Sequence, residues 1–107
     1  MILINITMPI RPEKIDEWLL LADAYAKDVN AEAGCLFFKF SRNLADAAEF
    51  VCIEGFIDAE AGAFHVQQPY VKRFFEVAPT LVSAQPQIIY LDAPHDGFGP
   101  MAEIQPR

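Results

Sequence analysis

Two side chains that can exchange protons stand out in this chain. His65 lies near the predicted end of a short helix, and Glu54 lies between Ile53 and Gly55 in an otherwise apolar predicted strand. Histidine titrates near neutral pH, and burial raises the pKa of a carboxylic acid, so the pair suits acid–base chemistry on a small molecule. We predict that His65 is the catalytic base or orienting group and that Glu54 is its catalytic partner.

Each of these residues also has a purely structural interpretation. His65 could cap its helix from the protein surface, because the helix dipole favours a cation at that end. Glu54 could form an ion pair with Lys39, which a regular hairpin places nearly opposite. The position of the His65 ring decides between the two views. A ring turned toward the sheet supports catalysis, and a ring in bulk solvent contradicts it.

Four further residues are predicted to line a cavity around these groups. In a regular hairpin Phe37 opposes Glu54, and Phe56 shares their face. Tyr70 and Tyr25 could each add a phenol to the cavity, although tyrosines more commonly pack in the core, and Asn5 is an unusual polar residue in the middle of a strand. The predicted substrate-binding residues are Asn5, Phe37, Phe56 and Tyr70. The other face of the hairpin is predicted to be wholly apolar, with Leu36, Phe38, Phe40, Val51, Ile53 and Gly55.

The two cysteines, Cys35 and Cys52, indicate neither a disulfide nor a metal site. About four residues of the hairpin separate them, roughly 13 Å along the strand, which exceeds the ~7 Å Cα separation that a disulfide tolerates. Neither has a histidine beside it, and the chain contains no glycine-rich phosphate loop, GxSxG or HExxH motif. We therefore expect no metal and no nucleotide-binding fold.

The composition excludes several classes of protein. The 107 residues are 53% hydrophobic and carry a formal net charge of −7, which is typical of one globular domain. Eight basic residues against fifteen acidic ones, with no basic run, argue against binding to nucleic acid or to an anionic membrane. No apolar stretch approaches the ~20 residues of a membrane span, and no signal peptide is recognisable, so we expect a cytoplasmic protein.

Apolar periodicity predicts the elements that position these residues. Alternation from Ile2 to Met8 predicts a strand, and apolar residues at helical spacing from Ile15 to Val29 predict a long helix. Asp58 is the predicted N-cap of a short helix that Pro69 ends. The remaining strands are predicted over residues 35–42, 49–56 and 87–91. The short helix is predicted over residues 59–66, and one further helix over 70–77.

The element order βαββαβ predicts an α+β protein of the ferredoxin-like class, with a four-stranded antiparallel sheet and the helices on one face. We expect one domain over residues 1–92 and an extended C-terminal arm over 93–107. Nearly every strand position is apolar on both faces, yet the helices cover only one. Since an uncovered apolar face of this size requires a partner, we predict a homodimer built sheet against sheet.

Several short motifs occur in the same order as in the antibiotic biosynthesis monooxygenase superfamily of dimeric α+β barrels, which the chain resembles from about Ile2 to Tyr90. That superfamily includes quinol monooxygenases and the isomerase of phosphorylated autoinducer-2. The motifs are Pro12-Glu13-Lys14 with Glu17-Trp18, Glu32-Ala33-Gly34-Cys35, the run EFVCIEGF at 49–56, and Phe64-His65 followed by Pro69 and Lys72. The family often has Trp where this chain has Phe56, and a second His where it has Tyr70.

The resemblance implies a dimeric α/β barrel with a small-molecule cavity in each subunit. Members of the monooxygenase branch oxidise electron-rich aromatics with O₂ and without flavin, haem or metal. The resemblance therefore implies a cofactor-independent monooxygenase acting on a small quinol-like or polyketide-like aromatic. Two alternatives remain open: an isomerase of a small dicarbonyl, with or without a phosphate, and a non-catalytic dimeric ligand-binding or stress-response module.

Overall fold

The central strand of the sheet is built from the alternating apolar residues near the N-terminus. The computed structural model describes all 107 residues, and β1 (Ile2–Pro9) pairs with both β3 (Asp46–Phe56) and β4 (Gln87–Asp92). With β2 (Cys35–Asn43) beside β3, the strand order is β2-β3-β1-β4, and each neighbouring pair is antiparallel. The predicted ferredoxin-like sheet is confirmed.

The helices begin and end where their capping residues indicate. The Asp58 carboxylate accepts a hydrogen bond from the Ala61 N–H at 2.8 Å, and this N-cap contact starts the second helix. Pro69 separates that helix from the third, so two short helices together occupy the second helical position of the fold. None of the helices has both the length and the hydropathy needed to span a bilayer. They are α1 (Ile15–Asn30), α2 (Ala59–Val66) and α3 (Pro69–Val77), with 3₁₀ turns at Pro12–Lys14 and Ala78–Thr80.

Two side chains of α1 fix the helix against the sheet. Trp18 is fully buried, and its ring contacts those of Phe40 on β2 and Phe74 on α3, with centroids 5.3 and 5.9 Å away. At the last residue of α1, the Asn30 side chain accepts a hydrogen bond from the Phe38 N–H at 3.1 Å and donates one to the Phe38 carbonyl at 2.9 Å. The whole length of α1 is therefore tied to β2.

The β2–β3 hairpin differs by one residue from the predicted register. A bulge at Leu36, between Cys35 and Phe37, makes Phe38 rather than Phe37 the partner of Glu54. A one-residue shift turns every later side chain of a strand to the other face of the sheet. The predicted faces of β2 are therefore wrong. The side chains that face the helices from this hairpin include Phe38, Phe40, Cys52 and Glu54.

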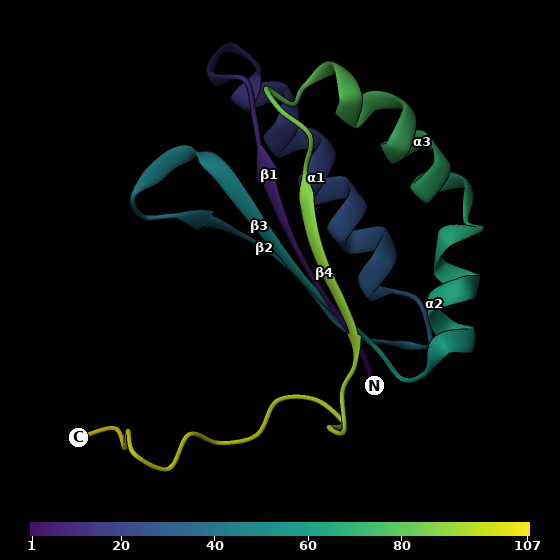
Figure 1. Ribbon diagram of the computed structural model, residues 1–107, viewed down its shortest axis with the longest axis vertical. Helices are drawn as coiled ribbons and strands as arrows, with labels where there is room; N and C mark the ends of the chain where they lie inside the picture. The colour runs from purple at the N-terminus through teal and green to yellow at the C-terminus, as the bar shows by residue number, and fades with distance from the viewer.

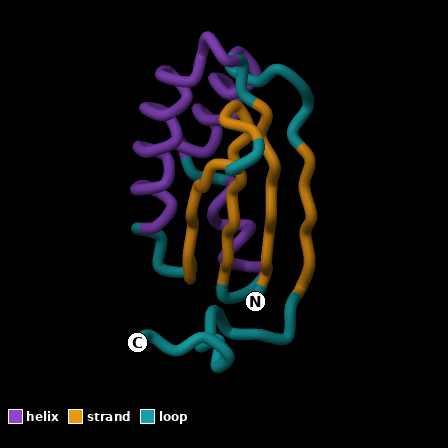
Figure 2. Tube along the Cα trace, turned by 90° about the vertical axis from the view of Figure 1, so that its left-hand side faces the viewer, coloured by secondary structure: helices purple, strands orange, loops and turns teal.

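The molecule has two layers, because all three helices lie on one face of the sheet (Figures 1 and 2). The predicted placement of the helices is thus confirmed. The other face has no helix over it, and we call it the open face. Alternation with the helix-facing residues assigns to it a group of half-buried or exposed apolar side chains. They are Leu3, Val51, Ile53, Ile89 and Leu91.

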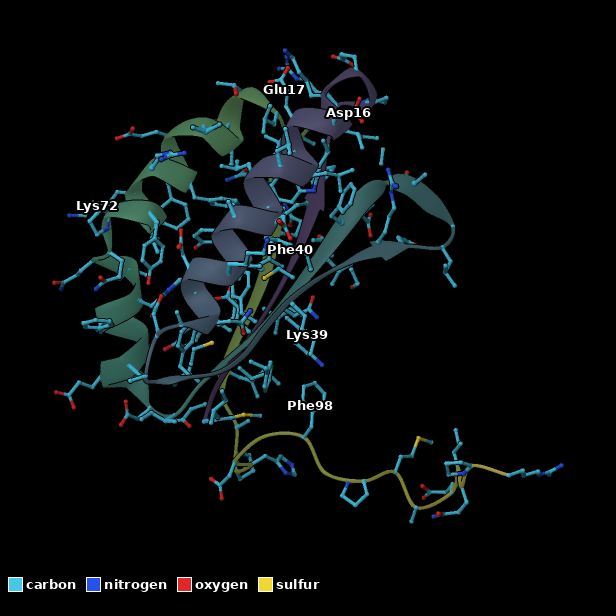
Figure 3. All side chains as sticks on the ribbon, turned by 180° about the vertical axis from the view of Figure 1, so that it is seen from behind. Asp16, Glu17, Lys39, Phe40, Lys72 and Phe98 are labelled. Atoms are coloured by element: carbon cyan, nitrogen blue, oxygen red, sulfur yellow. The ribbon has the colours of Figure 1, made fainter.

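Residues 93–107 follow β4 as an irregular arm that runs past the end of the sheet (Figure 1). Figure 3 shows Phe98 of this arm pointing toward Lys39 on β2. The Phe98 ring lies 4.7 Å from the Phe37 ring and 4.8 Å from the Lys39 ammonium, measured to the Phe98 centroid. The arm therefore shields Phe37 at one corner of the open face.

The close approach of the turn before β2 to α2 predicts opposite effects for two glycine substitutions. A Cβ added at Gly34 would lie 2.5 Å from the Ala61 Cβ, so Gly34→Ala should lower the free energy of unfolding by about 1–3 kcal/mol. A Cβ at Gly62 meets nothing within 4 Å, so Gly62→Ala should raise it by up to about 1 kcal/mol, because alanine favours a helix. Urea denaturation measures the unfolding free energy of both variants. Equal changes in the two variants would contradict the close contact between Gly34 and Ala61.

Candidate active site

A cavity of about 360 Å³ lies between the helix-facing side of the sheet and the helices α2 and α3. Ile88 and Tyr90 of β4, both more than half exposed, contribute to its wall at the edge of the sheet. Most of the lining is apolar, and the few polar side chains are Tyr25, Cys52, Glu54, His65 and Tyr90. This composition is typical of a site that binds a small, mainly apolar molecule and orients it with a few polar contacts.

His65 is central to the polar part of the cavity. It lies in the last turn of α2, its side chain is 6% exposed, and its ring packs on the Phe56 ring with centroids 4.9 Å apart. The ring is turned into the protein, away from bulk solvent. Its Nδ1 lies 2.8 Å from the Glu32 Oε2. Since a carboxylate accepts hydrogen bonds, Nδ1 carries the hydrogen and Nε2 is left to accept a proton.

Glu32 lies in the turn between α1 and β2, and its side chain is 4% exposed. Its Oε2 also accepts a hydrogen bond from the Tyr70 hydroxyl at 2.5 Å, while its Oε1 is buried without a partner. A buried carboxylate is costly unless donors surround it. Glu32 therefore depends on His65 and Tyr70, and in return it holds the imidazole in one orientation.

Glu54 faces the other nitrogen of the imidazole. Its Oε1 lies 3.9 Å from the His65 Nε2, and the Tyr25 hydroxyl lies 3.4 Å from the same nitrogen. The Cys52 thiol donates a hydrogen bond to the Glu54 Oε2 at 3.6 Å. Burial raises the pKa of Glu54, partly opposed by the nearby His65. Lys39, the ion-pair partner suggested by the sequence, lies on the open face and cannot reach it.

Burial also raises the pKa values of the phenols and thiols around the site. It raises the pKa of Tyr25 and of Tyr70, and the Glu32 carboxylate adds to the effect at both. It raises the pKa of Cys35 to about 11 and that of Cys52 also. These groups keep their protons at neutral pH and serve as donors. Both cysteines are free, and no group of three or more His, Cys, Asp or Glu side chains is arranged to hold a metal ion.

Of the four residues predicted to bind substrate, only Phe56 lines the cavity. Asn5 alternates with the helix-facing residues of β1 and so lies on the open face. Phe37 lies there too, because the bulge in β2 reverses its direction. Tyr70 approaches from behind the site, where its hydroxyl contacts Glu32 and no part of the cavity wall. Within one protomer, Asn5, Phe37 and Tyr70 therefore do not line the cavity that contains His65, although Tyr70 lines a separate cavity beside Glu32. Substrate binding by these three residues stays a prediction.

Glu32 belongs to the site, although the sequence did not single it out as a site residue, and so does Tyr25, for which core packing was the more common expectation. Glu32 follows the C-terminus of α1 by two residues, where the helix dipole disfavours a carboxylate, and it opens one of the motifs shared with the family, but neither signal assigns it a role. Tyr25 has the spacing of a core residue and is one, since its ring stacks on Phe74 with centroids 4.0 Å apart. Only the three-dimensional structure shows that its hydroxyl reaches His65.

The fold and the site together define a ferredoxin-like α+β protein with a buried histidine–carboxylate pair beside an apolar cavity. Residues 1–77 match the family described as antibiotic biosynthesis monooxygenase. The chain belongs to this family. One curated relative, an uncharacterized protein of Synechocystis sp., is 25% identical over 79 residues, which cover 74% of this chain and 54% of the relative. The chain thus spans about half the length of that protein.

Solved structures share the fold over nearly the whole domain. A crystal structure of an antibiotic biosynthesis monooxygenase is 24% identical, has a TM-score of 0.82, and is matched over 87% of this chain and 98% of its own. A protein from Deinococcus radiodurans, provisionally given the same name, is 22% identical with a TM-score of 0.84, over 94% of this chain and 99% of its own. At these identities the likeness shows the fold alone.

The raised pKa of Glu54 predicts how stability depends on pH. The folded protein holds this proton more tightly than the unfolded chain, in which a glutamate titrates near ~4.3. The resulting stabilisation is fully present below that value and is lost as the pH rises through the higher folded-state pKa. Relative to Glu54→Gln, the unfolding free energy of the wild type should therefore fall as the pH rises.

Urea denaturation from about pH 4 to pH 8 tests this, with Glu76→Gln on the exposed surface of α3 as the matched control. The control should follow the wild type at every pH. A wild-type curve that stays parallel to that of Glu54→Gln would show that burial does not perturb this carboxyl group.

Proposed function

We propose that the protein is a cofactor-independent monooxygenase that oxidises a small quinol-like or polyketide-like aromatic with O₂. One observation carries this proposal: His65 is held at Nδ1 by Glu32 and directs Nε2 into an apolar cavity. An electron-rich aromatic reduces O₂ more readily once it is deprotonated, so the protein's tasks are to remove a proton, orient the ring and exclude water. Membership of the monooxygenase family supports the same class of reaction.

In the proposed reaction, Nε2 of His65 takes a proton from the substrate, and Glu32 stabilises the imidazolium that forms. The deprotonated substrate gives electrons to O₂, and a carbon–oxygen bond forms to yield a peroxide. The imidazolium returns its proton to the peroxide, the O–O bond breaks, and water leaves. The substrate thus loses two hydrogens and gains one oxygen atom, and the other oxygen atom becomes water.

Two donors stand beside the base in this scheme. Glu54 in its protonated form and the Tyr25 hydroxyl both lie on the Nε2 side of the ring, where an oxygen of the substrate would be placed. Hydrogen bonds from them would stabilise negative charge as it develops on that oxygen. Tyr70 acts through Glu32 and is a positioning residue.

The alternative of a phosphorylated dicarbonyl substrate has less support. A phosphate group requires cationic donors, and no lysine or arginine lines the cavity. A non-catalytic module would use the same cavity but would not need a base, so the effect of replacing His65 on turnover separates it from the monooxygenase.

We also propose that two copies pair through their open faces. Ile89 and Leu91 on this face are 65% and 42% exposed, and a second copy would cover them. Asn5 and Phe37 would then lie at or beside the interface. The two free cysteines suit a reducing compartment such as the cytoplasm, where we place the reaction.

Replacing His65 tests the proposed reaction. We expect the wild type to consume O₂ with at least one member of a panel of hydroquinones and anthrones, and His65→Gln to lose about 10²–10⁴-fold in kcat, as for other general bases. His95→Gln is the control, because His95 is exposed on the C-terminal arm. An oxygen electrode measures turnover, and circular dichroism checks the fold. A folded wild type that oxidises no member of the panel would falsify the proposal.

Replacing Ile89 tests the proposed dimer. Sedimentation of the wild type should give twice the chain mass of 12.0 kDa. Ile89→Glu places a charge in the proposed interface and should shift the equilibrium toward the monomer, while Leu44→Glu in the exposed β2–β3 turn should not. A monodisperse wild-type monomer at micromolar concentration contradicts the sheet-to-sheet arrangement.

A further inference from the structure

We infer that the substrate of the proposed reaction carries a flexible hydrocarbon tail, which lies beyond the aromatic ring between β1, α3 and the segment that leads into β4. The inference rests on the proposed function and narrows its substrate to a polar aromatic head joined to an apolar chain. The inference follows from the position and polarity of two cavities that share an apolar wall.

A second cavity, of about 460 Å³, adjoins the one that contains His65. Ile6 and Met8 of β1 and Phe74 and Phe75 of α3 line both of them. Because four side chains from two separate elements border both spaces, the two cavities adjoin along one apolar wall, and we infer that one flexible ligand occupies both. We call the part with His65 the head compartment. The tail compartment is the part completed by Ala78, Pro79, Val82, Gln85 and Pro86.

Nearly all the polar groups lie in one of these two adjoining cavities. The five side chains that can exchange or donate protons, including His65 and Glu54, all lie in the head compartment. The tail compartment contains no charged residue, and Gln85 is its one polar side chain. A ligand that matches this distribution has its hydrogen-bonding groups at one end and hydrocarbon at the other, since unpaired polar atoms are costly against apolar walls.

The compartments extend in line with β4. Tyr90 lies on the head compartment and Pro86 on the tail compartment, four residues or roughly 13 Å apart along an extended chain. A single aromatic ring at His65 therefore leaves the far end unoccupied. Phe75, which borders both spaces, is 60% exposed, so a tail lying there would cover apolar surface that now faces solvent.

A series of hydroquinones with methyl, butyl and octyl substituents tests the inference. For the wild type we expect kcat/KM to rise with tail length, by up to about fourfold per methylene, the equivalent of ~0.8 kcal/mol for each buried methylene. Gln85→Trp places a large side chain in the tail compartment and should abolish most of this increase. The matched control is Gln67→Trp, an exposed position at the end of α2 that lines neither compartment and should retain the increase.

Calorimetric binding of 4-alkylphenols with the same three substituents gives a second readout that needs no turnover. Turnover that is independent of tail length, in the wild type and in both variants, overturns the inference and leaves the monooxygenase proposal standing. Binding that strengthens with tail length and weakens in Gln85→Trp supports the tail compartment even if no hydroquinone is oxidised, in which case the monooxygenase proposal fails. An increase with tail length that survives in Gln85→Trp also overturns the inference.

Discussion

A carboxylate buried in a protein is tolerated only where hydrogen-bond donors surround it, and Glu32 obtains both of its donors from the α2–α3 segment. His65 belongs to α2 and Tyr70 to α3, while Glu32 itself lies in the turn that leads from α1 into β2. One oxygen atom therefore joins three parts of the chain. The same contact fixes which imidazole nitrogen carries the hydrogen, so the packing of the helices and the chemistry proposed for the cavity depend on one interaction.

The two carboxyl groups beside His65 are suited to different roles by their surroundings. Glu32 receives two strong donors and lies outside the cavity wall, whereas Glu54 lies on that wall and receives only a thiol. Burial consequently favours the protonated form of Glu54. Glu32 orients the base His65 through Nδ1, and the acid Glu54 lies near Nε2. This arrangement can remove a proton from a ligand and also stabilise the anion that results.

Much of the fold could be predicted because its signals are local. Asp58 and Pro69 mark the limits of α2, and both act through contacts within a few residues, so the predicted range of 59–66 agrees with the structure. The faces of β2 could not be predicted in this way. The bulge at Leu36 adds one residue to the strand without any glycine or proline to mark it, and every side chain after it changes face.

The same distinction applies to the site. His65 could be singled out from its residue type and its place near the end of a predicted helix, whereas its partner Glu32 lies 33 residues away and shows no periodic pattern. The assignment of Phe37 to the cavity rested on a regular hairpin, and the bulge in β2 moves it to the open face, whereas Asn5 was assigned only as an unusual polar residue in a strand. Errors of this kind come from register, which depends on contacts between strands and not on residue type.

The side chain of Asn30 has a consequence for the outer edge of the sheet. β2 is an edge strand, and the free N–H and C=O groups of such a strand can recruit a strand from another molecule. At Phe38 both groups are already occupied by the Asn30 amide, which supplies one donor and one acceptor much as a neighbouring strand would. A single helical residue thus interrupts the template that would otherwise allow one molecule to extend the sheet of the next, and it leaves β4 as the edge where unwanted strand addition would begin.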